Sequence, residues 1–549
     1  MYIRLSKGST AKKTKVYLVE GYRDENGKSK QRIIKKYGNL EDLEAKDPNI
    51  LEKLRAQAKE IPKNEVKITL NLSDPNTEKE KDKNYGYFFL ENIYNELDIS
   101  TFLKSFSFKK NHHYNIDEIM KMLVFGRILK PESKKKSFEG GDEYFTPFKC
   151  ELNSVDQLLA QMDEIKEDLQ GHLNRKVSET YGRDATLVFY DVTNYYFETD
   201  IEDEFKKKCV SKDKKTKPLI EMGLLIDEKG LPITYQLFPG NANERGTLIP
   251  FLADVRQKYK LGRITLTADK SFNSVKNLTN LLSKDDGYIV SQKVRNGSKK
   301  FIKEVLDEED YVTNDSNIFK IKSFIRERNV KNEFGSNEII KEKCVCFWSK
   351  NNNDCEKKRR EKAEEKLEEY LNNPSKYTKV DKETTEIEDK EVVLAFEKEK
   401  YEREVSLDGY YVLVSSELEM TNAEIIEKYR GLWKIEESFR VIKPDLEGRP
   451  VDMTREYYIE AHFLIYFIAL LISRILEMKL DYEYNIKSIR DSLKNATCRK
   501  VERSIYSLNK QDEVFRAIEK AFDVSLDFKH VRIEQLREYK RKIINNIIN

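Results

Sequence analysis

The spacing of apolar residues changes along the chain and predicts a helical region followed by a sheet. Residues 85–180 carry apolar side chains at helical intervals, as in Ile116–Phe125, which predicts mostly helix. From residue 185 the apolar residues form short runs typical of strands buried on both faces. The predicted strands are Thr186–Asp191, Ile220–Asp227, Pro232–Phe238, Ile264–Asp269 and Tyr288–Ser291, with helices at about Thr247–Lys258 and Ser274–Ser283.

The order of these elements predicts which strands are neighbours. A turn at residues 227–230 joins the second and third strands as an antiparallel hairpin. Three strands, a helix, a strand, a helix and a strand make up the order of the RNase H-like fold, in which the first and fourth strands are adjacent. Asp191 and Asp269 end those two strands. We therefore expect their carboxylates to meet at the rim of the sheet, where α/β folds bind ligands.

The stretch from Glu427 to Pro444 has the composition of a nucleic-acid-binding helix. We expect one helix that Pro444 ends, because proline cannot continue the hydrogen-bond ladder. Tyr429, Glu436 and Lys443 are seven residues apart, so each lies within roughly 20° of the last around the axis. Aromatic and basic side chains on one face suit a groove that holds nucleic acid. Trp433 and Arg440 lie on the same side.

The first residues of the chain concentrate positive charge. Residues 16–23 and 31–35 have strand patterns around an Asn-Gly turn, which predicts a β-hairpin. Residues 1–40 hold eleven lysines and arginines against three acids, a net charge of +8 in a chain whose total is +3. A basic patch on a nearly neutral protein favours local phosphate contact. A solvated basic hairpin is the alternative interpretation.

The segments together predict an α/β protein with six parts. The basic hairpin arm covers 1–72, and a charged linker follows near Ser73–Asn84. The helical region, 85–180, is expected to bind DNA. An RNase H-like core with a mixed five-stranded sheet is split into 185–294 and 408–480, the second part carrying the glutamate helix. Between them lies a β-rich insertion domain, 295–407, and a helical C-terminal region, 481–549, is a candidate for dimerisation.

Several classes of protein are disfavoured by what the sequence contains. Six cysteines in 549 residues do not form a disulfide framework, and they lack the spacing of a zinc site. The longest apolar run, Phe463–Ile472, is too short to span a bilayer and predicts a buried helix. We find no P-loop pattern and no arrangement of the five histidines that indicates catalysis. The start of the chain has no apolar signal-peptide core, so we expect a cytoplasmic protein without a membrane partner.

Three carboxylates that converge at a sheet rim and a neighbouring helix could bind divalent cations. Asp191, Asp269 and Glu436 are the candidates. Mg²⁺ prefers oxygen ligands and leaves positions open for water and phosphate. Two such ions can activate the attacking oxygen and stabilise the leaving one in phosphodiester displacement. An aspartate after a strand is often only a turn former or helix cap, so each residue taken alone is weak evidence.

The motifs around these acids resemble those of DDE transposases from bacterial insertion sequences, in the group with a Tyr-x2-Arg-x3-Glu-x6-Lys signature. Tyr429, Glu436 and Lys443 match that signature, whereas Leu432 stands at the arginine position. Arg430 is the candidate to replace the missing arginine. Further matches are Tyr190–Glu198 around the first acid, Thr267–Ser274 around the second, and Trp433 through Glu437.

The resemblance implies a cut-and-paste transposase with catalytic, metal-binding Asp191, Asp269 and Glu436. Two Mg²⁺ ions per active site, replaceable by Mn²⁺, would assist water in cutting each end, and the freed 3′-OH would attack target DNA. The implied partners are double-stranded DNA, as terminal inverted repeats and target, and a second subunit in a homodimeric synaptic complex. The implied DNA-binding residues are Tyr429, Arg430, Trp433, Arg440 and Lys443, with Trp433 placed to stack on a base.

Two alternatives remain. The Leu432 departure is compatible with an inactive, transposase-derived DNA-binding protein, which would bind transposon ends without nicking them. The predicted fold would also suit another RNase H-like nuclease, because a fold does not determine a function. Joining of a cut end to new DNA separates the transposase from both.

Overall fold

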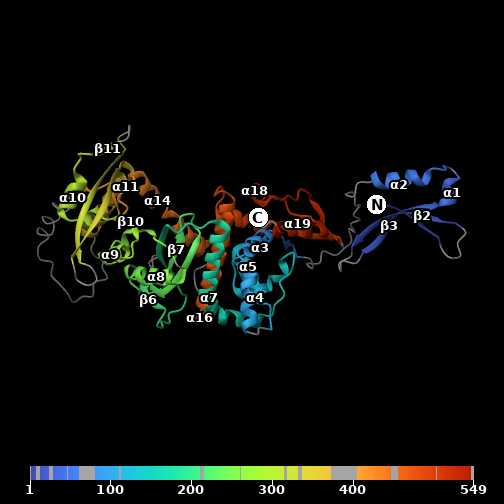
Figure 1. Ribbon diagram of the computed structural model, residues 1–549, viewed down its shortest axis with the longest axis horizontal. Helices are drawn as coiled ribbons and strands as arrows, with labels where there is room; N and C mark the ends of the chain where they lie inside the picture. Colours follow the sequence, from blue (N-terminus) through green and yellow to red (C-terminus); the bar gives the residue numbers. More distant parts are fainter. Residues whose placement is uncertain are drawn as a thin grey trace. The chain divides into compact units, whose positions relative to one another are not determined.

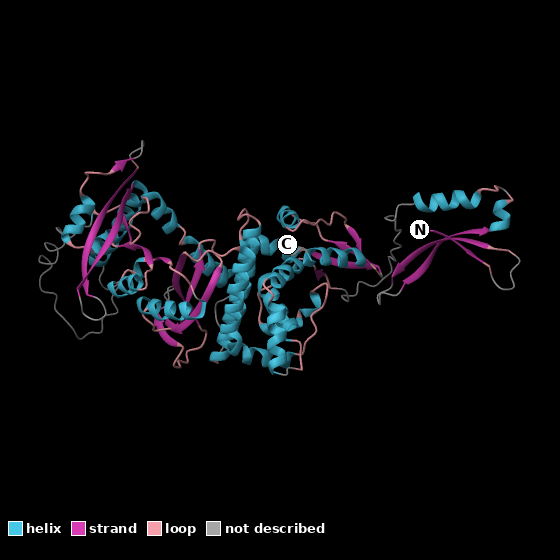
Figure 2. Cartoon of the chain, in the orientation of Figure 1, coloured by secondary structure: helices cyan, strands magenta, loops and turns pink. Residues whose placement is uncertain are grey.

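A computed structural model of the chain consists of two compact units, which are described separately (Figures 1 and 2). One unit contains residues 1–88, 142–147 and 492–546, and the other contains 89–141, 148–491 and the last three residues. The structure describes residues 2–7, 13–23, 29–45, 47–60, 81–110, 113–210, 216–259, 261–313, 318–331, 337–372, 403, 405–446, 455–502 and 504–545.

The larger unit is built on a ten-stranded mixed sheet, counted over the described residues. Its central strands are β5 (Leu187–Tyr196), β9 (Thr265–Ala268) and β10 (Gly287–Gln292), which run parallel to one another. β7 (Thr216–Asp227) pairs antiparallel with β5, and β8 (Pro232–Pro239) pairs with β7. The predicted adjacency of the first and fourth strands is thus confirmed, as is the hairpin of the second and third.

The sheet continues beyond the five predicted strands. On its far side β14 (Tyr410–Ser415) pairs with β10, followed by β13 (Asn337–Ser349), β12 (Phe319–Lys331) and β11 (Val312–Thr313). β6 (Lys207–Val210) pairs with β7 at the opposite edge. The five-strand prediction is therefore wrong in number. The described strands within 295–407 extend the same sheet, because β13 pairs with β14 along six residues.

Helices cover the sheet and bury its apolar residues. Side chains of β5, β9 and β10 such as Val188 and Tyr190 are buried in one core with residues of α8 (Glu244–Tyr259) and α9 (Val275–Ser283). Three short segments follow the core strands: η2 (Lys270–Phe272), η3 (Val294–Asn296) and α10 (Lys299–Leu306). α11 (Lys350–Asn372) follows β13.

The predicted helical region is confirmed for the part that the structure describes. It contains α3 (Tyr87–Glu96), α4 (Ile99–Lys110), α5 (Ile116–Leu129), α6 (Lys134–Glu139), η1 (Gly141–Glu143) and α7 (Leu152–Tyr181). The long helix α16 (Glu456–Lys479) packs against α5 and α7. Among the described helices α16 alone is long and apolar enough to cross a membrane, and 94% of its most apolar window is buried inside the protein, as in a core helix.

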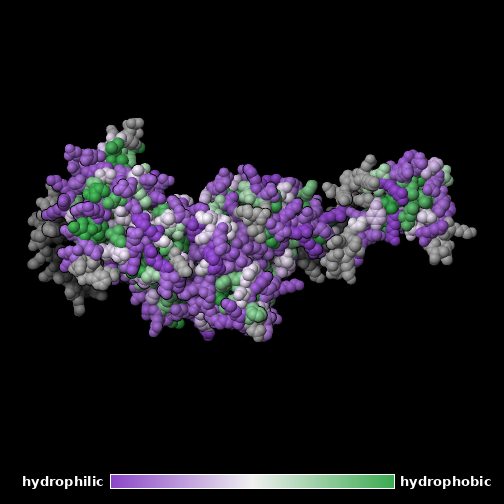
Figure 3. All heavy atoms as spheres, viewed as in Figure 1, coloured by the Kyte–Doolittle hydropathy of each residue, from purple (hydrophilic) through white to green (hydrophobic). Residues whose placement is uncertain are grey.

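The smaller unit contains two sheets. One is an antiparallel sheet of β1 (Tyr2–Ser6), β2 (Lys15–Arg23) and β3 (Ser29–Asn39). Two helices, α1 (Leu40–Glu44) and α2 (Ile50–Glu60), follow β3 in the chain. The predicted hairpin strands are confirmed, whereas the turn at 24–28 and most of the predicted linker lie outside the described residues. Figure 3 shows apolar side chains among the polar surface of this sheet, where Ile33 and Ile34 are exposed.

The C-terminal region is not wholly helical, contrary to prediction. After α17 (Ile486–Asn495) the strands β15 (Thr497–Glu502), β16 (Ile505–Leu508) and β17 (His530–Arg532) form a sheet with β4 (Lys83–Asn84). The region also contains the helices α18 (Glu513–Ala521) and α19 (Ile533–Asn545). These short strands alternate weakly between apolar and polar residues, so no strand pattern stands out in the sequence.

Candidate active site

The two aspartates lie at equivalent positions on neighbouring parallel strands. Tyr190 pairs with Ala268 in the register of β5 and β9, so Asp191 and Asp269 come next on each strand. β9 ends there, whereas β5 continues to Tyr196. Asp191 is therefore inside its strand rather than at its end, because β7 still pairs with β5 along this stretch. The two acids nevertheless meet where the parallel pairing stops.

The glutamate segment is two helices rather than one. α14 (Asn422–Arg430) and α15 (Trp433–Arg440) are separated at Gly431 and Leu432, and a π-helical turn, η4 (Val441–Asp445), follows. Gly431 packs so tightly that a Cβ atom there would lie 2.4 Å from Cζ of Phe189. Pro444 lies inside the π turn, where Leu446 N donates to Val441 O at 2.9 Å. This longer bond spans the proline, which has no N–H to donate.

α15 lies along the face of β5 that carries Asp191. Alternate residues of a strand point to the same face, so Phe189, Asp191 and Thr193 share one. Gly431, before α15, abuts Phe189, and Lys443, after it, donates a hydrogen bond to the Thr193 hydroxyl. Glu436 lies between these two anchor points in the chain. The geometry explains how Glu436 comes to line the same pocket as Asp191 despite the break in the helix.

The three candidate acids line one pocket of about 450 Å³. Asp191, Asp269 and Glu436 are the acidic residues of the described lining, and Arg430 is its one basic residue. Negative charge is therefore in excess in this pocket. Apolar and aromatic side chains form most of the remaining lining: Phe319, Phe347, Tyr411, Leu413, Ile426, Tyr429, Leu432, Trp433 and Ile435, with Asn352.

The predicted DNA-contacting residues divide into two groups. Tyr429, Arg430 and Trp433 line the pocket, and Trp433 is 55% exposed. Arg440 and Lys443 are not among the described lining residues. Arg440 Nε donates to Glu437 at 2.6 Å, and Lys443 lies 5.3 Å from the ring centre of Tyr195. The division falls after the helix break, because Trp433 begins α15 and lines the pocket, whereas Arg440 ends α15 and Lys443 lies in η4.

Tyr429 is a partly buried phenol that lines the pocket with the acids. Its hydroxyl lies 3.0 Å from the hydroxyl of Tyr411 on β14. Burial raises the pKa of Tyr429 well above its ordinary value, and the nearby Tyr411 and Asp269 raise it further. The phenol therefore keeps its proton at any physiological pH and can serve as a hydrogen-bond donor.

The donor chemistry of the pocket fits a hard divalent cation. Its acidic lining offers only carboxylate oxygens, with no imidazole or thiolate among the described lining residues, and Mg²⁺ and Mn²⁺ prefer such ligands. Throughout the described ranges, no three acidic, histidine or cysteine side chains stand close enough together to hold a metal ion as they are. The carboxylates surround the pocket rather than forming a closed ligand set.

Three arginines that are not among the predicted site residues, two of them buried and one partly buried, hold the glutamate segment in place. Arg474 of α16 donates to Lys434 O at 3.2 Å and to Ser438 Oγ at 3.0 Å, and it pairs with Glu477 at 2.6 Å. Near the end of the segment, Arg127 donates to Leu446 O at 3.2 Å. Arg490 donates to Asp445 O at 2.7 Å. The sequence signal for this role is that Arg474 stands among the apolar residues of α16, where a charged side chain needs a buried partner.

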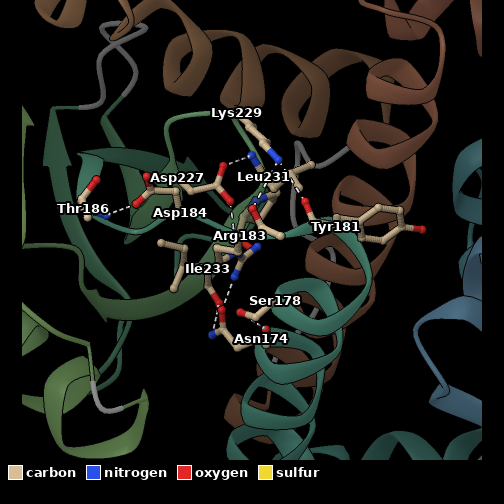
Figure 4. A network of polar contacts seen from close by, with 12 residues as sticks. Asn174, Ser178, Tyr181, Arg183, Asp184, Thr186, Asp227, Lys229, Leu231 and Ile233 are labelled. Carbon is tan, nitrogen blue, oxygen red and sulfur yellow. Dashed lines mark hydrogen bonds and ion pairs between the residues drawn. The ribbon is translucent and has the colours of Figure 1, made fainter.

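A second buried network fixes the start of β5 (Figure 4). Arg183 connects α7 to β5, and its Nε donates to Asp227 Oδ2 at 3.0 Å while an Nη donates to Pro232 O at 2.7 Å. Asn174 of α7 bonds the same guanidinium. Burial raises the pKa of Asp227, and the arginine opposes that rise. The strand that carries Asp191 thus begins at an ion pair almost inaccessible to solvent.

Two family models match the chain, and both describe transposases. Residues 182–472 match the family model described as "Transposase DDE domain". Residues 4–69 match "IS1634 family transposase, N-terminal domain". No curated protein matches the chain. A solved structure of a piggyBac transposase synaptic complex with hairpin DNA is similar over 85% of this chain and 76% of that chain, at 10% identity and a TM-score of 0.34.

Proposed function

The chain belongs to the insertion-sequence DDE transposases, and we propose that it cuts the ends of its element and joins them to target DNA. The observation that carries this proposal is the pocket that brings together Asp191, Asp269 and Glu436 from segments far apart in the chain. The strand order of β8, β7, β5, β9 and β10 supports an RNase H-like core for this chemistry.

Family membership implies dependence on a divalent metal. In the proposal Asp191, Asp269 and Glu436 hold two Mg²⁺ ions, for which Mn²⁺ can substitute. Bound divalent ions activate an attacking oxygen and stabilise a leaving one. The excess of carboxylates over arginine in the pocket supports this assignment, because the negative charge needs a cation to balance it.

The remaining lining residues are suited to position DNA. Arg430 has no acidic partner among the described residues and can bind a phosphate in place of the arginine that Leu432 replaces. The protonated Tyr429 can donate to a phosphate oxygen. The exposed indole of Trp433 can stack on a base. Arg440 and Lys443 flank the pocket and would contact phosphates farther along the strand.

Other parts of the chain would hold the ends and the second subunit. The basic arm within residues 1–72 is our candidate for binding the terminal repeats, supported by exposed Lys35 and Lys36 on β3. The helical region 85–180 would add contacts to the duplex. We propose that a homodimer assembles the two ends, with residues 481–549 as a candidate interface.

The proposal is tested by joining of a labelled element end to a target plasmid. We expect the wild-type protein to join ends in Mg²⁺ and Glu436→Gln to lose joining by at least 100-fold. Glu437→Gln is the matched control, because its carboxylate is held by Arg440 outside the pocket. End binding without cleavage in any divalent metal would support the inactive DNA-binding alternative, and cleavage without joining would support a nuclease.

A further inference from the structure

A second pocket, of about 420 Å³, lies on the same sheet and has the opposite charge. Four basic side chains line it, and no acidic residue is among its described lining. The other lining residues are amides and hydroxyls, which donate hydrogen bonds to phosphate oxygens as well. The lining consists of Arg245, Lys270, Lys293 and Arg328 with Ser271, Asn273, Ser291, Gln292 and Asn296.

The positive charge of this basic pocket is largely uncompensated. Within the described ranges the side chains of Arg245, Lys270 and Lys293 form no ion pair, and all three are exposed. Arg328 pairs with the buried Glu342 at 2.9 Å, but Arg326 pairs with the same carboxylate at 2.7 Å. The single carboxylate of Glu342 thus pairs with two arginines, so the part of the pocket around Arg328 also keeps a net positive charge. An anion is the ligand that such a cluster favours.

The basic pocket adjoins the carboxylate pocket through two neighbouring strands. Lys270 directly follows Asp269, which lines the carboxylate pocket. Ser291 of β10 lines the basic pocket, and its register partner in β14, Leu413, lines the carboxylate pocket. A single DNA strand lying across the ends of β9 and β10 would meet both pockets.

We propose that the basic pocket binds a backbone phosphate of the same DNA whose reacting phosphate lies among the three carboxylates. This inference rests on the proposed function. The exposure of the lysines favours a polymer that lies over the surface, because a free phosphate ion is better held where water is excluded. A bound phosphate here fixes the register of the strand, so that the bond to be cut faces Asp191, Asp269 and Glu436.

The salt dependence of DNA binding measures this phosphate binding directly. Removal of one lysine–phosphate interaction reduces the slope of log K against log salt by about 0.9. We expect Lys270→Ala/Lys293→Ala, which weakens the contact with one phosphate, to reduce the magnitude of the slope by about 1 and to slow end cleavage at least 10-fold. Lys284→Ala is the matched control, because this exposed lysine lies at the opposite end of α9, about 13 Å along the helix. An unchanged slope in the double variant would overturn the proposal.

A neutral methylphosphonate scanned along the duplex identifies the phosphate that is bound. At the contacted position, we expect the neutral linkage to weaken wild-type binding and to leave the double variant unaffected. Equal weakening for both proteins at every position would contradict the proposal. Displacement of the DNA by inorganic phosphate at matched ionic strength would also contradict it, because the pocket would then be a site for the free ion. If the slope and the scan give the expected result but no metal supports cleavage, the basic pocket stands and the proposed transposase activity fails.

Discussion

Two neighbouring glutamates show how single residues acquire different roles. Glu436 is exposed and faces the pocket, whereas Glu437 is partly buried and bound to Arg440. The signature spacing from Tyr429 predicts Glu436 as a catalytic residue, and the structure places its side chain in the pocket with Asp191 and Asp269. Arg440 and Glu437 have the local i, i+3 spacing of a helix, whereas the contact of Lys443 with Thr193 joins positions 250 residues apart and has no signal in the sequence. The contact of Arg440 and Lys443 with DNA remains a prediction.

Arg474 is expected to act on the metal site by positioning α15. Arg474→Met should raise the half-saturating Mg²⁺ concentration for end cleavage by about 10- to 100-fold, as for residues that orient metal ligands. DNA affinity should change little, because the guanidinium is buried under α15. The measurement is a metal titration of cleavage beside a DNA-binding isotherm.

The variant Arg474→Met/Glu477→Gln controls for the acid that would otherwise be left unpaired. This double variant should show the same rise in the half-saturating Mg²⁺ concentration as Arg474→Met, and it should be more stable to unfolding than that single variant. Equal loss of DNA binding and metal affinity would show that Arg474 supports the fold in general and not the glutamate helix in particular.

Arg183 is expected to be essential for stability. Arg183→Met leaves Asp227 buried without its partner and should lower the free energy of unfolding by about 3–5 kcal/mol. Urea unfolding measures the change. Arg183→Met/Asp227→Asn should recover part of the loss, since it removes the unpaired charge. A single variant as stable as the wild type would show that the network in Figure 4 does not stabilise the start of β5.

Secondary-structure elements divide into those set by local pattern and those set by tertiary pairing. The core strands and helices were predicted within a few residues, since continuous apolar runs and helical spacing are local signals. The break at Gly431 and the joining of β12 and β13 to the sheet were not predicted. Both depend on partners far away in the chain, Phe189 in one case and β14 in the other.

Gly431 is expected to set how closely α15 approaches β5. Gly431→Ala places a methyl group against the Phe189 ring and should destabilise the protein by about 1–3 kcal/mol, the usual effect of overpacking. Phe189→Leu in the same chain should return part of the stability and of the end-cleavage activity, because it frees space for the methyl group. If the losses of stability in the two single variants simply add in the double variant, the packing of Gly431 against Phe189 does not set the position of α15. Thermal unfolding and end cleavage are the two measurements.

In the whole chain, the proposed active site lies in the sheet of the larger unit, and the basic arm within residues 1–72 is the proposed site that recognises the element end. β3 carries exposed Lys35 and Lys36 beside exposed Ile33 and Ile34. Lys35→Ala/Lys36→Ala should reduce preference for the element end over scrambled DNA at least 10-fold, because the arm is the proposed site of end recognition. Competition gel shifts measure this preference. Unchanged preference, in this variant and after removal of residues 1–72, would assign end recognition to another region.

The proposed active site is made from three carboxylates that lie far apart in the chain. Its most direct test is nicking of a labelled duplex that carries the element's own end, with Mg²⁺ or with EDTA, by wild type and by Asp191→Asn. Asp200→Asn is the control, an exposed aspartate that is not among the described pocket-lining residues. We predict metal-dependent nicking at the end junction that is lost in Asp191→Asn and kept in Asp200→Asn. Equal nicking by all three proteins would contradict the account.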